Sequence, residues 1–160
     1  MNKKLIIGYG NSLAGDDAVG FYTVKELSGS SLPPEITVKY IHQLMPEHSS
    51  EFTEYDTIIF IDAEESEVPG EIRHREIHTS DLKDTAAAAH EFTLDTILLM
   101  GYWLYGKMPE IHLITVTGSN FTTGESMSPA VQKSIPGVID AVFSVINRED
   151  TVDADFAADR

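Results

Sequence analysis

The sequence predicts a three-layer α/β domain with a mostly parallel sheet. Short apolar runs typical of buried strands alternate with stretches in which apolar residues recur every three or four positions. Their order along the chain is β-α-β-α-β-β-α-β-α, which favours a parallel sheet covered by helices on both faces. A length of 160 residues suits one domain with a substantial core.

The first half of the chain contains three of the predicted strands. A glycine-rich loop, 8–15, follows the first strand. Asp16 and Asp17 then open a helix, because acidic side chains are favoured at a helix N-terminus. In order, the elements are a strand at 5–7, a helix beginning at Asp16, a strand at 36–41, a short helix near Pro46 and a strand at 57–61.

The second half adds two strands and two long helices. Residues 71–77 alternate in polarity as an exposed edge strand does. Ser128 and Pro129 suit an N-cap and a first helical position, and Pro136 predicts a kink or a restart of the last helix. The elements are an edge strand at 71–77, a helix at 86–105, a strand at 111–116 and a helix from 129 to about 147. We therefore expect a single domain at 1–147 and an acidic, frayed tail at 148–160.

Composition excludes several functions. The chain has no cysteine, so it forms neither a disulfide nor a thiolate zinc site and has no cysteine nucleophile. With 11 basic and 26 acidic residues the formal charge is −15, which disfavours binding to nucleic acid. No apolar run is long enough to span a membrane, and residues 1–4 lead into a strand without a signal-peptide cleavage site. The expected location is the cytoplasm.

Two acidic features are predicted to meet at one edge of the sheet. Asp17 follows the first strand across the glycine loop, and Asp62 follows the third strand directly. If these strands are neighbours, their carboxyl ends converge where open α/β sheets bind ligands. Asp17 lies three residues before Gly20, on the inward face of its helix, whereas Asp16 is rotated away by about 100°. The pattern favours Asp17 as a site residue and Asp16 as a cap.

His90 is the third candidate, because it opens a predicted helix. The helix dipole disfavours imidazolium there, and a neutral imidazole can coordinate a metal. Two carboxylates and one histidine suit a borderline divalent ion such as nickel, zinc or iron. Each residue also has a structural alternative, namely a helix cap, the end of a strand or a hydrogen-bonded core histidine. The remaining histidines show no ligand spacing: His42, His48, His74, His78 and His112.

The glycine loop also raises a nucleotide-binding alternative, which the details of the loop disfavour. Leu13 stands where a dinucleotide fingerprint has its third glycine. Gly15 is followed by two aspartates instead of the Lys-Ser/Thr of a phosphate loop, and those carboxylates repel phosphate. The sequence also lacks the Gly-x-Ser-x-Gly elbow of serine hydrolases.

Several stretches, in the same order along nearly the whole chain, resemble the hydrogenase maturation proteases. These endopeptidases remove a C-terminal extension from the large subunit of nickel–iron hydrogenases. The specific part is Gly-x-Gly-Asn-x-Leu-x-x-Asp-Asp, which begins at Gly8. The stretches are 6–20, 42–47 (His-Gln-Leu-Met-Pro-Glu), 60–63 (Phe-Ile-Asp-Ala), the segment from His90, 104–109 (Leu-Tyr-Gly-Lys-Met-Pro) and 124–129 (Gly-Glu-Ser-Met-Ser-Pro).

The resemblance implies a mixed, mostly parallel five-stranded sheet with one antiparallel strand, in a three-layer α/β/α fold like that of phosphorylases and hydrolases. Matched by motif, the metal-binding and catalytic positions fall on Asp17, Asp62 and His90. The first of these is a glutamate in some relatives. The alanines at 86–89 carry little of the family's pattern, so the match at His90 is the least specific of the three.

The resemblance also implies a substrate and a mechanism. The substrate would be the nickel-loaded hydrogenase large-subunit precursor, engaged by a monomer, with nickel held mainly by the precursor's cysteines. Another divalent ion could take nickel's place in vitro. A water nucleophile would be activated by a carboxylate or by the metal. The alternatives are a metal-dependent chaperone that does not cleave, a related hydrolase of another peptide, and a small nucleotide-binding domain.

Overall fold

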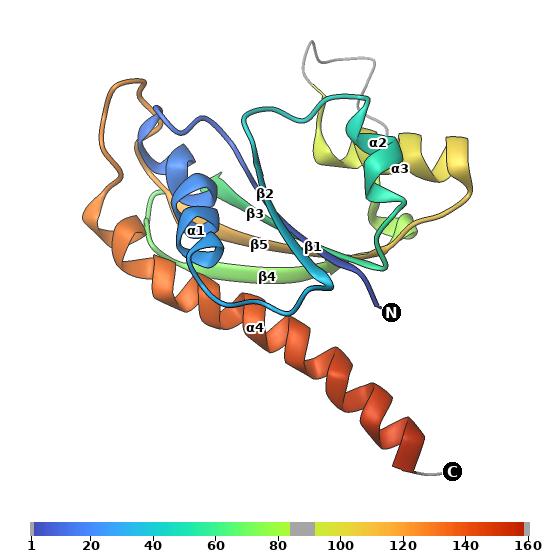
Figure 1. The fold of residues 1–160 in the computed structure, drawn as a ribbon. Helices are drawn as coiled ribbons and strands as arrows, with labels where there is room; N and C mark the ends of the chain where they lie inside the picture. The colour runs from blue at the N-terminus through green and yellow to red at the C-terminus, as the bar shows by residue number, and fades with distance from the viewer. Residues whose placement is uncertain (1, 84–91, 159–160) are drawn as a thin grey trace.

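A five-stranded sheet separates two layers of helices (Figure 1). The computed structural model describes residues 2–83 and 92–158. One helix layer packs α1 and α4 against the sheet, and the other consists of α2 and α3. The helices are α1 (Val19–Ser28), α2 (His48–Phe52), α3 (Leu94–Tyr105) and α4 (Pro129–Ala158). The predicted three-layer α/β/α architecture is confirmed.

The strand order of the sheet is β2-β1-β3-β5-β4. β1, β2, β3 and β5 are parallel, and β4 pairs with β5 in the antiparallel direction at one edge. The strands are β1 (Lys4–Tyr9), β2 (Ile36–Ile41), β3 (Thr57–Glu65), β4 (Ile72–Ile77) and β5 (Glu110–Gly118). The antiparallel edge strand is confirmed. β1 and β3 are direct neighbours, which is the condition for convergence of the two acidic features.

Two hydrophobic cores form because successive strand residues point to opposite faces. Ile6 and Ile59 pack toward α1 and α4, whereas Ile7 and Phe60 pack toward α2 and α3. All four side chains are fully buried. The central strands therefore consist of nearly continuous apolar residues, as expected for parallel strands covered on both faces.

The predicted helix at 86–105 begins later in the structure. α3 starts at Leu94, after Thr93, whose hydroxyl accepts a hydrogen bond from the Thr96 amide at 3.2 Å. Thr93 is thus an N-cap that the hydrophobic periodicity hides. The earlier part of the predicted helix, including His90, lies outside the described residues.

The last helix is longer than predicted. α4 continues to Ala158 beyond the expected end at Asn147, and Pro136 does not interrupt it, so a restart there is wrong. Buried residues on both sides of the proline, Val131 and Val142, pack the helix against the core and compensate for the lost backbone hydrogen bond. The division into a domain at 1–147 and a tail stays a prediction. Among the helices of the described residues, none combines the length and apolar character needed to cross a membrane.

Contact between α1 and the sheet depends on Gly8 of β1. A Cβ atom on Gly8 would collide with the carbonyl oxygen of Gly20 and lie 2.8 Å from Cγ2 of Val24. We predict that Gly8→Ala lowers the free energy of unfolding by about 1–3 kcal/mol, because α1 must move away from β1. Gly29→Ala is the matched control, since its Cβ would come no closer than 3.5 Å to any atom. Urea denaturation measures both variants, and equal stabilities would contradict this account of the packing.

Candidate functional site

Asp17 and Asp62 line one hollow at the carboxyl edge of the sheet. Its volume is about 250 Å³. Asp62 lies within β3, which continues to Glu65 instead of ending at Ile61 as predicted. The last pair between β1 and β3 joins Gly8 to Ile61, so Asp62 extends past the paired part of β1. The hollow is lined by Tyr9, Gly10, Asp17, His42, Gln43, Leu44, Asp62, Ala63 and Phe92.

The carboxyl group of Asp62 is held in a largely desolvated environment. Burial raises its pKa to about 7, although hydrogen bonds from the Tyr9 hydroxyl and the Ala63 amide act in the opposite direction. The hydrogen bond from the Ala63 amide to Oδ1 of Asp62 measures 2.7 Å. The negative charges of Asp17 and Glu64 raise the pKa further. Near neutral pH, Asp62 therefore exists both as the carboxylate and as the carboxylic acid, which suits a group that exchanges protons or awaits a cation.

The glycine loop holds Asp17 by its backbone. The Asn11 amide donates a hydrogen bond to Oδ2 of Asp17 at 2.6 Å. Gly10 has a φ of 135°, and a Cβ atom there would lie 2.9 Å from Oδ1 of Asp17. The Tyr40 hydroxyl fixes the Gly10 carbonyl at 2.5 Å. Because only a glycine fits at this position, the carboxylate can sit close against the loop, half-buried and facing the hollow.

Asp16 has a structural role, but it is not the cap of its own helix that the sequence predicts. Its side chain is fully buried and has no capping hydrogen bond within its own helix. Its carboxylate instead accepts hydrogen bonds from the amides of Ser119, Asn120 and Ser128 and from the Ser128 hydroxyl, at 2.7 to 3.1 Å. Burial alone would raise the pKa of Asp16, yet these bonds lower it below its usual value. Asp16 thus holds the loop before α4 against the start of α1.

The three predicted site residues are therefore only partly described. Asp17 and Asp62 lie at one hollow, and His90 lies outside the described residues; the catalytic and metal-binding roles of all three stay predictions. The structure adds His42, an exposed residue that lines the same hollow. His42 directly follows β2, the strand that pairs with β1 on its other side. The rule that selected Asp62 from the end of a strand would have selected His42 as well.

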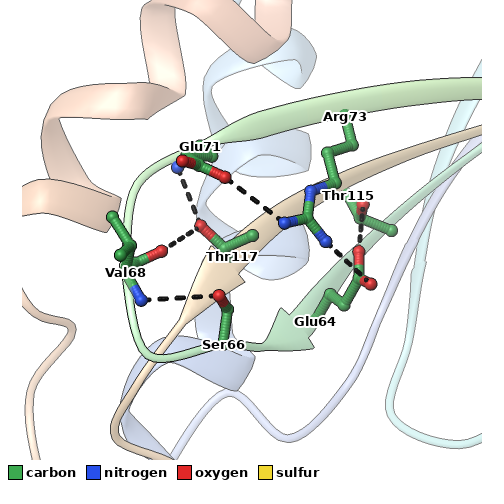
Figure 2. A network of polar contacts seen from close by, with 7 residues as sticks. All are labelled: Glu64, Ser66, Val68, Glu71, Arg73, Thr115 and Thr117. Carbon is green, nitrogen blue, oxygen red and sulfur yellow. Dashed lines mark hydrogen bonds and ion pairs between the residues drawn. The ribbon is translucent and has the colours of Figure 1, made fainter.

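A second hollow of about 420 Å³ shares Asp62 and Ala63 with the first and extends toward β4. Its wall contains Arg73, which Glu64 and Glu71 hold at 3.1 and 3.3 Å (Figure 2). The Thr115 hydroxyl donates to Glu64 at 3.1 Å and fixes this carboxylate in turn.

Polar contacts also fix the turn between β3 and β4. The Thr117 hydroxyl donates to the Val68 carbonyl at 2.7 Å and accepts from the Glu71 amide at 2.8 Å (Figure 2).

In contrast to Arg73, Arg75 lines the second hollow without an ion pair or hydrogen bond among the residues that the structure describes. A larger hollow of about 670 Å³ lies beside Glu26, Met127 and Pro136 and contains none of the predicted site residues.

The structure also joins histidines for which the sequence showed no ligand spacing. Nδ1 of His112 lies 2.9 Å from Nε2 of His74, and Nε2 of His112 lies 2.7 Å from a carboxylate oxygen of Glu110. Burial, followed by the charges of His112 and Arg148, lowers the pKa of His74. With Glu76, the residues Glu110 and His112 form a group able to hold a metal ion. This group could have been found only from the antiparallel register of β4 and β5, because residue spacing along one strand does not show which residues of two strands pair.

Several solved structures that resemble this one are hydrogenase maturation peptidases. The hydrogenase 2 maturation peptidase of a Thaumarchaeota archaeon is 26% identical, with a TM-score of 0.70 over 90% of this chain and 97% of that chain. The endopeptidase HybD of Escherichia coli is 19% identical, with a TM-score of 0.77 over 92% and 93%. The maturation protease HycI of Thermococcus kodakarensis is 17% identical, with a TM-score of 0.72 over 91% and 93%.

The chain has the fold of the hydrogenase maturation proteases. This confirms the resemblance that its motifs indicate. No family model and no curated protein sequence matches the chain. The likeness therefore rests on the three-dimensional arrangement together with the glycine-loop motif.

The titration of Asp62 should respond to its two neighbours in opposite directions. In the metal-free protein we expect a carboxyl midpoint at about pH 7. Tyr9→Phe removes a hydrogen bond to the carboxylate and should raise this midpoint, whereas Asp17→Asn removes a repulsive charge and should lower it. Carbon-13 NMR of the carboxyl groups measures the shift, with Asp62→Asn to assign the signal. Shifts of the same sign in both variants would contradict this electrostatic account.

Asp16→Asn should destabilise the protein in a pH-dependent way. The pKa of Asp16 is lowered on folding, so the carboxylate stabilises the protein above its unfolded-state pKa of about 3.9. We expect a loss of about 1–3 kcal/mol at neutral pH, because amide donors lose a charged acceptor. The difference between wild type and variant should shrink as the pH falls below about 4. Urea denaturation at a series of pH values tests this, and a difference independent of pH would contradict it.

Proposed function

We propose that this protein is an endopeptidase that removes the C-terminal extension from the nickel-loaded large-subunit precursor of a nickel–iron hydrogenase. The observation that carries the proposal is the pair Asp17 and Asp62 at one hollow, in a fold shared with hydrogenase maturation peptidases. The matched motif assigns the same two residues. We place the reaction in the cytoplasm and propose that a monomer engages the precursor.

Asp17, Asp62 and His90 would contact the nickel ion of the precursor. Two carboxylates and an imidazole leave coordination positions open for ligands from the precursor. This division suits a chain without cysteine, which cannot by itself provide a thiolate cage. Phe92, two residues after His90 in the chain, lines the hollow.

Hydrolysis would use water as the nucleophile. A carboxylate oxygen of Asp17 or Asp62 that is not bound to the nickel would take a proton from water as the water oxygen attacks the scissile carbonyl carbon. The carbon–nitrogen bond then breaks, and the leaving amine receives the proton. Polarisation of the same water by the precursor's nickel remains the alternative within this proposal.

The surface around the hollow suits a protein substrate. The two hollows share Asp62, so an extended peptide can cross this residue and continue along β4 toward Arg75. Farther from the hollow, at the end of α3 that leads into the start of β5, Trp103 and Leu104 are 65% exposed. Large exposed apolar side chains next to one another are typical of protein-binding surfaces. We propose that they dock the folded precursor.

The direct test is incubation with purified precursor, nickel-loaded and nickel-free, followed by intact-mass measurement. We expect the wild type to release the extension from the loaded precursor alone. Asp17→Asn and Asp62→Asn should slow cleavage by about 100-fold or more. Asp140→Asn, an exposed aspartate on α4, is the matched control and should cleave at the wild-type rate.

Other outcomes would point to the alternatives. Binding of the loaded precursor without a loss of mass would favour a chaperone that does not cleave. Undiminished cleavage by both hollow variants would show that the proposed residues are wrong even if the activity is right. Binding of ATP or NAD in a calorimeter, with no cleavage, would revive the nucleotide-binding alternative.

A further inference from the structure

A second group of potential metal ligands lies away from the hollow that contains Asp17 and Asp62. His112 is near the start of β5, three residues before Thr115, which pairs with Asp62. On β3, His112 pairs with Ile59, which belongs to the core beneath α1 and α4. His112 therefore faces the α4 side of the sheet, whereas Asp62 follows Phe60 on the α2 and α3 side. The two sites lie on opposite faces.

Three ligand groups converge there because of the strand register. Glu76 of β4 pairs directly with His112 of β5, and Glu110 lies two residues before His112 on the same face. One ligand atom from each of the three residues lies within 4.8 Å of the others. In a tetrahedral zinc site with bonds of about 2.0–2.1 Å, ligand atoms lie about 3.3 Å apart. Small side-chain rotations would reach that spacing.

We propose that Glu76, Glu110 and His112 bind one divalent cation of the zinc type. His112 is a rigid ligand, because its side chain is fully buried. The side chains of Glu76 and Glu110 are 41% and 38% exposed, so they can rotate onto an ion that enters from solvent. Imidazole with two carboxylates suits zinc and its neighbours better than magnesium, which prefers oxygen ligands alone.

His74 acts as a positioning residue in this proposal. Its Nε2 lies 2.9 Å from Nδ1 of His112, which leaves Nε2 of His112 for the metal beside Glu110. A hydrogen bond at the second ring nitrogen orients a metal-binding histidine and fixes its tautomer. The structural alternative is that His74 and Glu110 only satisfy a buried histidine. That alternative does not account for the third ligand atom that Glu76, directly opposite His112, brings to the same group.

The cation would fasten the edge strand to the sheet. β4 pairs only with β5 within the described sheet, and it forms one wall of the second hollow through Arg73 and Arg75. A metal that bridges Glu76 on β4 to Glu110 and His112 on β5 would resist separation of these strands. A metal ion that binds only the folded state raises the melting temperature of the protein. The inference does not depend on peptidase activity.

The test is calorimetric titration of the metal-free full-length protein with Zn²⁺, with Mg²⁺ as the comparison. The double variant Glu76→Gln/Glu110→Gln should lose one equivalent of bound Zn²⁺ and the accompanying rise in melting temperature. Asp17→Asn/Asp62→Asn should keep this equivalent and its effect on the melting temperature, whether or not the hollow itself binds Zn²⁺. Glu54→Gln/Glu67→Gln makes the same charge change at exposed positions elsewhere and should match the wild type.

Two further variants separate a metal site from a structural cluster. His74→Gln should weaken Zn²⁺ binding by about 10- to 100-fold, as loss of an orienting partner does. His78→Gln should bind as the wild type does, although Nε2 of His78 lies 3.9 Å from Glu76. Equal Zn²⁺ stoichiometry in the wild type and the Glu76/Glu110 double variant would overturn the proposal, as would Mg²⁺ binding as tight as that of Zn²⁺. Because neither readout uses the precursor, failure here leaves the peptidase proposal unaffected.

Discussion

Parallel pairing of β1 with β3 is the constraint on which the candidate site depends. In the observed register Gly8 pairs with Ile61, so the chain of β1 leaves the sheet where β3 continues through Asp62. The glycine loop then turns back over this edge and brings Asp17 to the same hollow. A slip of one residue would turn Asp62 to the opposite face. Such a slip would also exchange Ile59 and Phe60 between the two cores, and the misfit of these buried side chains opposes it.

Two adjacent aspartates have different tasks because of where the chain turns. The fully buried Asp16 receives four hydrogen bonds from the loop that precedes α4, and so joins the start of the first helix to the start of the last. The half-buried Asp17 accepts one hydrogen bond from the Asn11 amide and borders the hollow. The hydrogen bonds to Asp16 lower the pKa of its carboxyl group, so this carboxylate stabilises the folded protein. Asp16 thereby stabilises the fold, while its neighbour Asp17 is left at the hollow.

The sequence predicted what local periodicity determines. The strand positions, the edge position of the strand at 71–77 and the inward direction of Asp17 follow from alternation and helical spacing, whereas the antiparallel direction of that strand was implied by the family resemblance. What could not be predicted depends on contacts between distant segments: Asp16 bonds to Ser128, and His112 meets Glu76 only through the β4–β5 register. The start of α3 at Leu94 was missed because alanine favours helices, which placed the predicted start at residue 86. The decisive signal was the N-cap residue Thr93. His90 stays a prediction from the motif.

Desolvation of Asp62 gives a physical basis for preferring a metal-loaded substrate under the proposed function. Burial raises the pKa of this carboxyl group to about 7, which means that the folded protein bears a cost for its negative charge. A cation that enters the hollow removes the cost by pairing with the carboxylates of Asp62 and Asp17, and a proton is released when it binds the acid form. A precursor without its metal offers no such compensation and leaves two like charges facing each other. Selectivity for the loaded precursor would then arise in part from the electrostatics of the two carboxyl groups at the hollow.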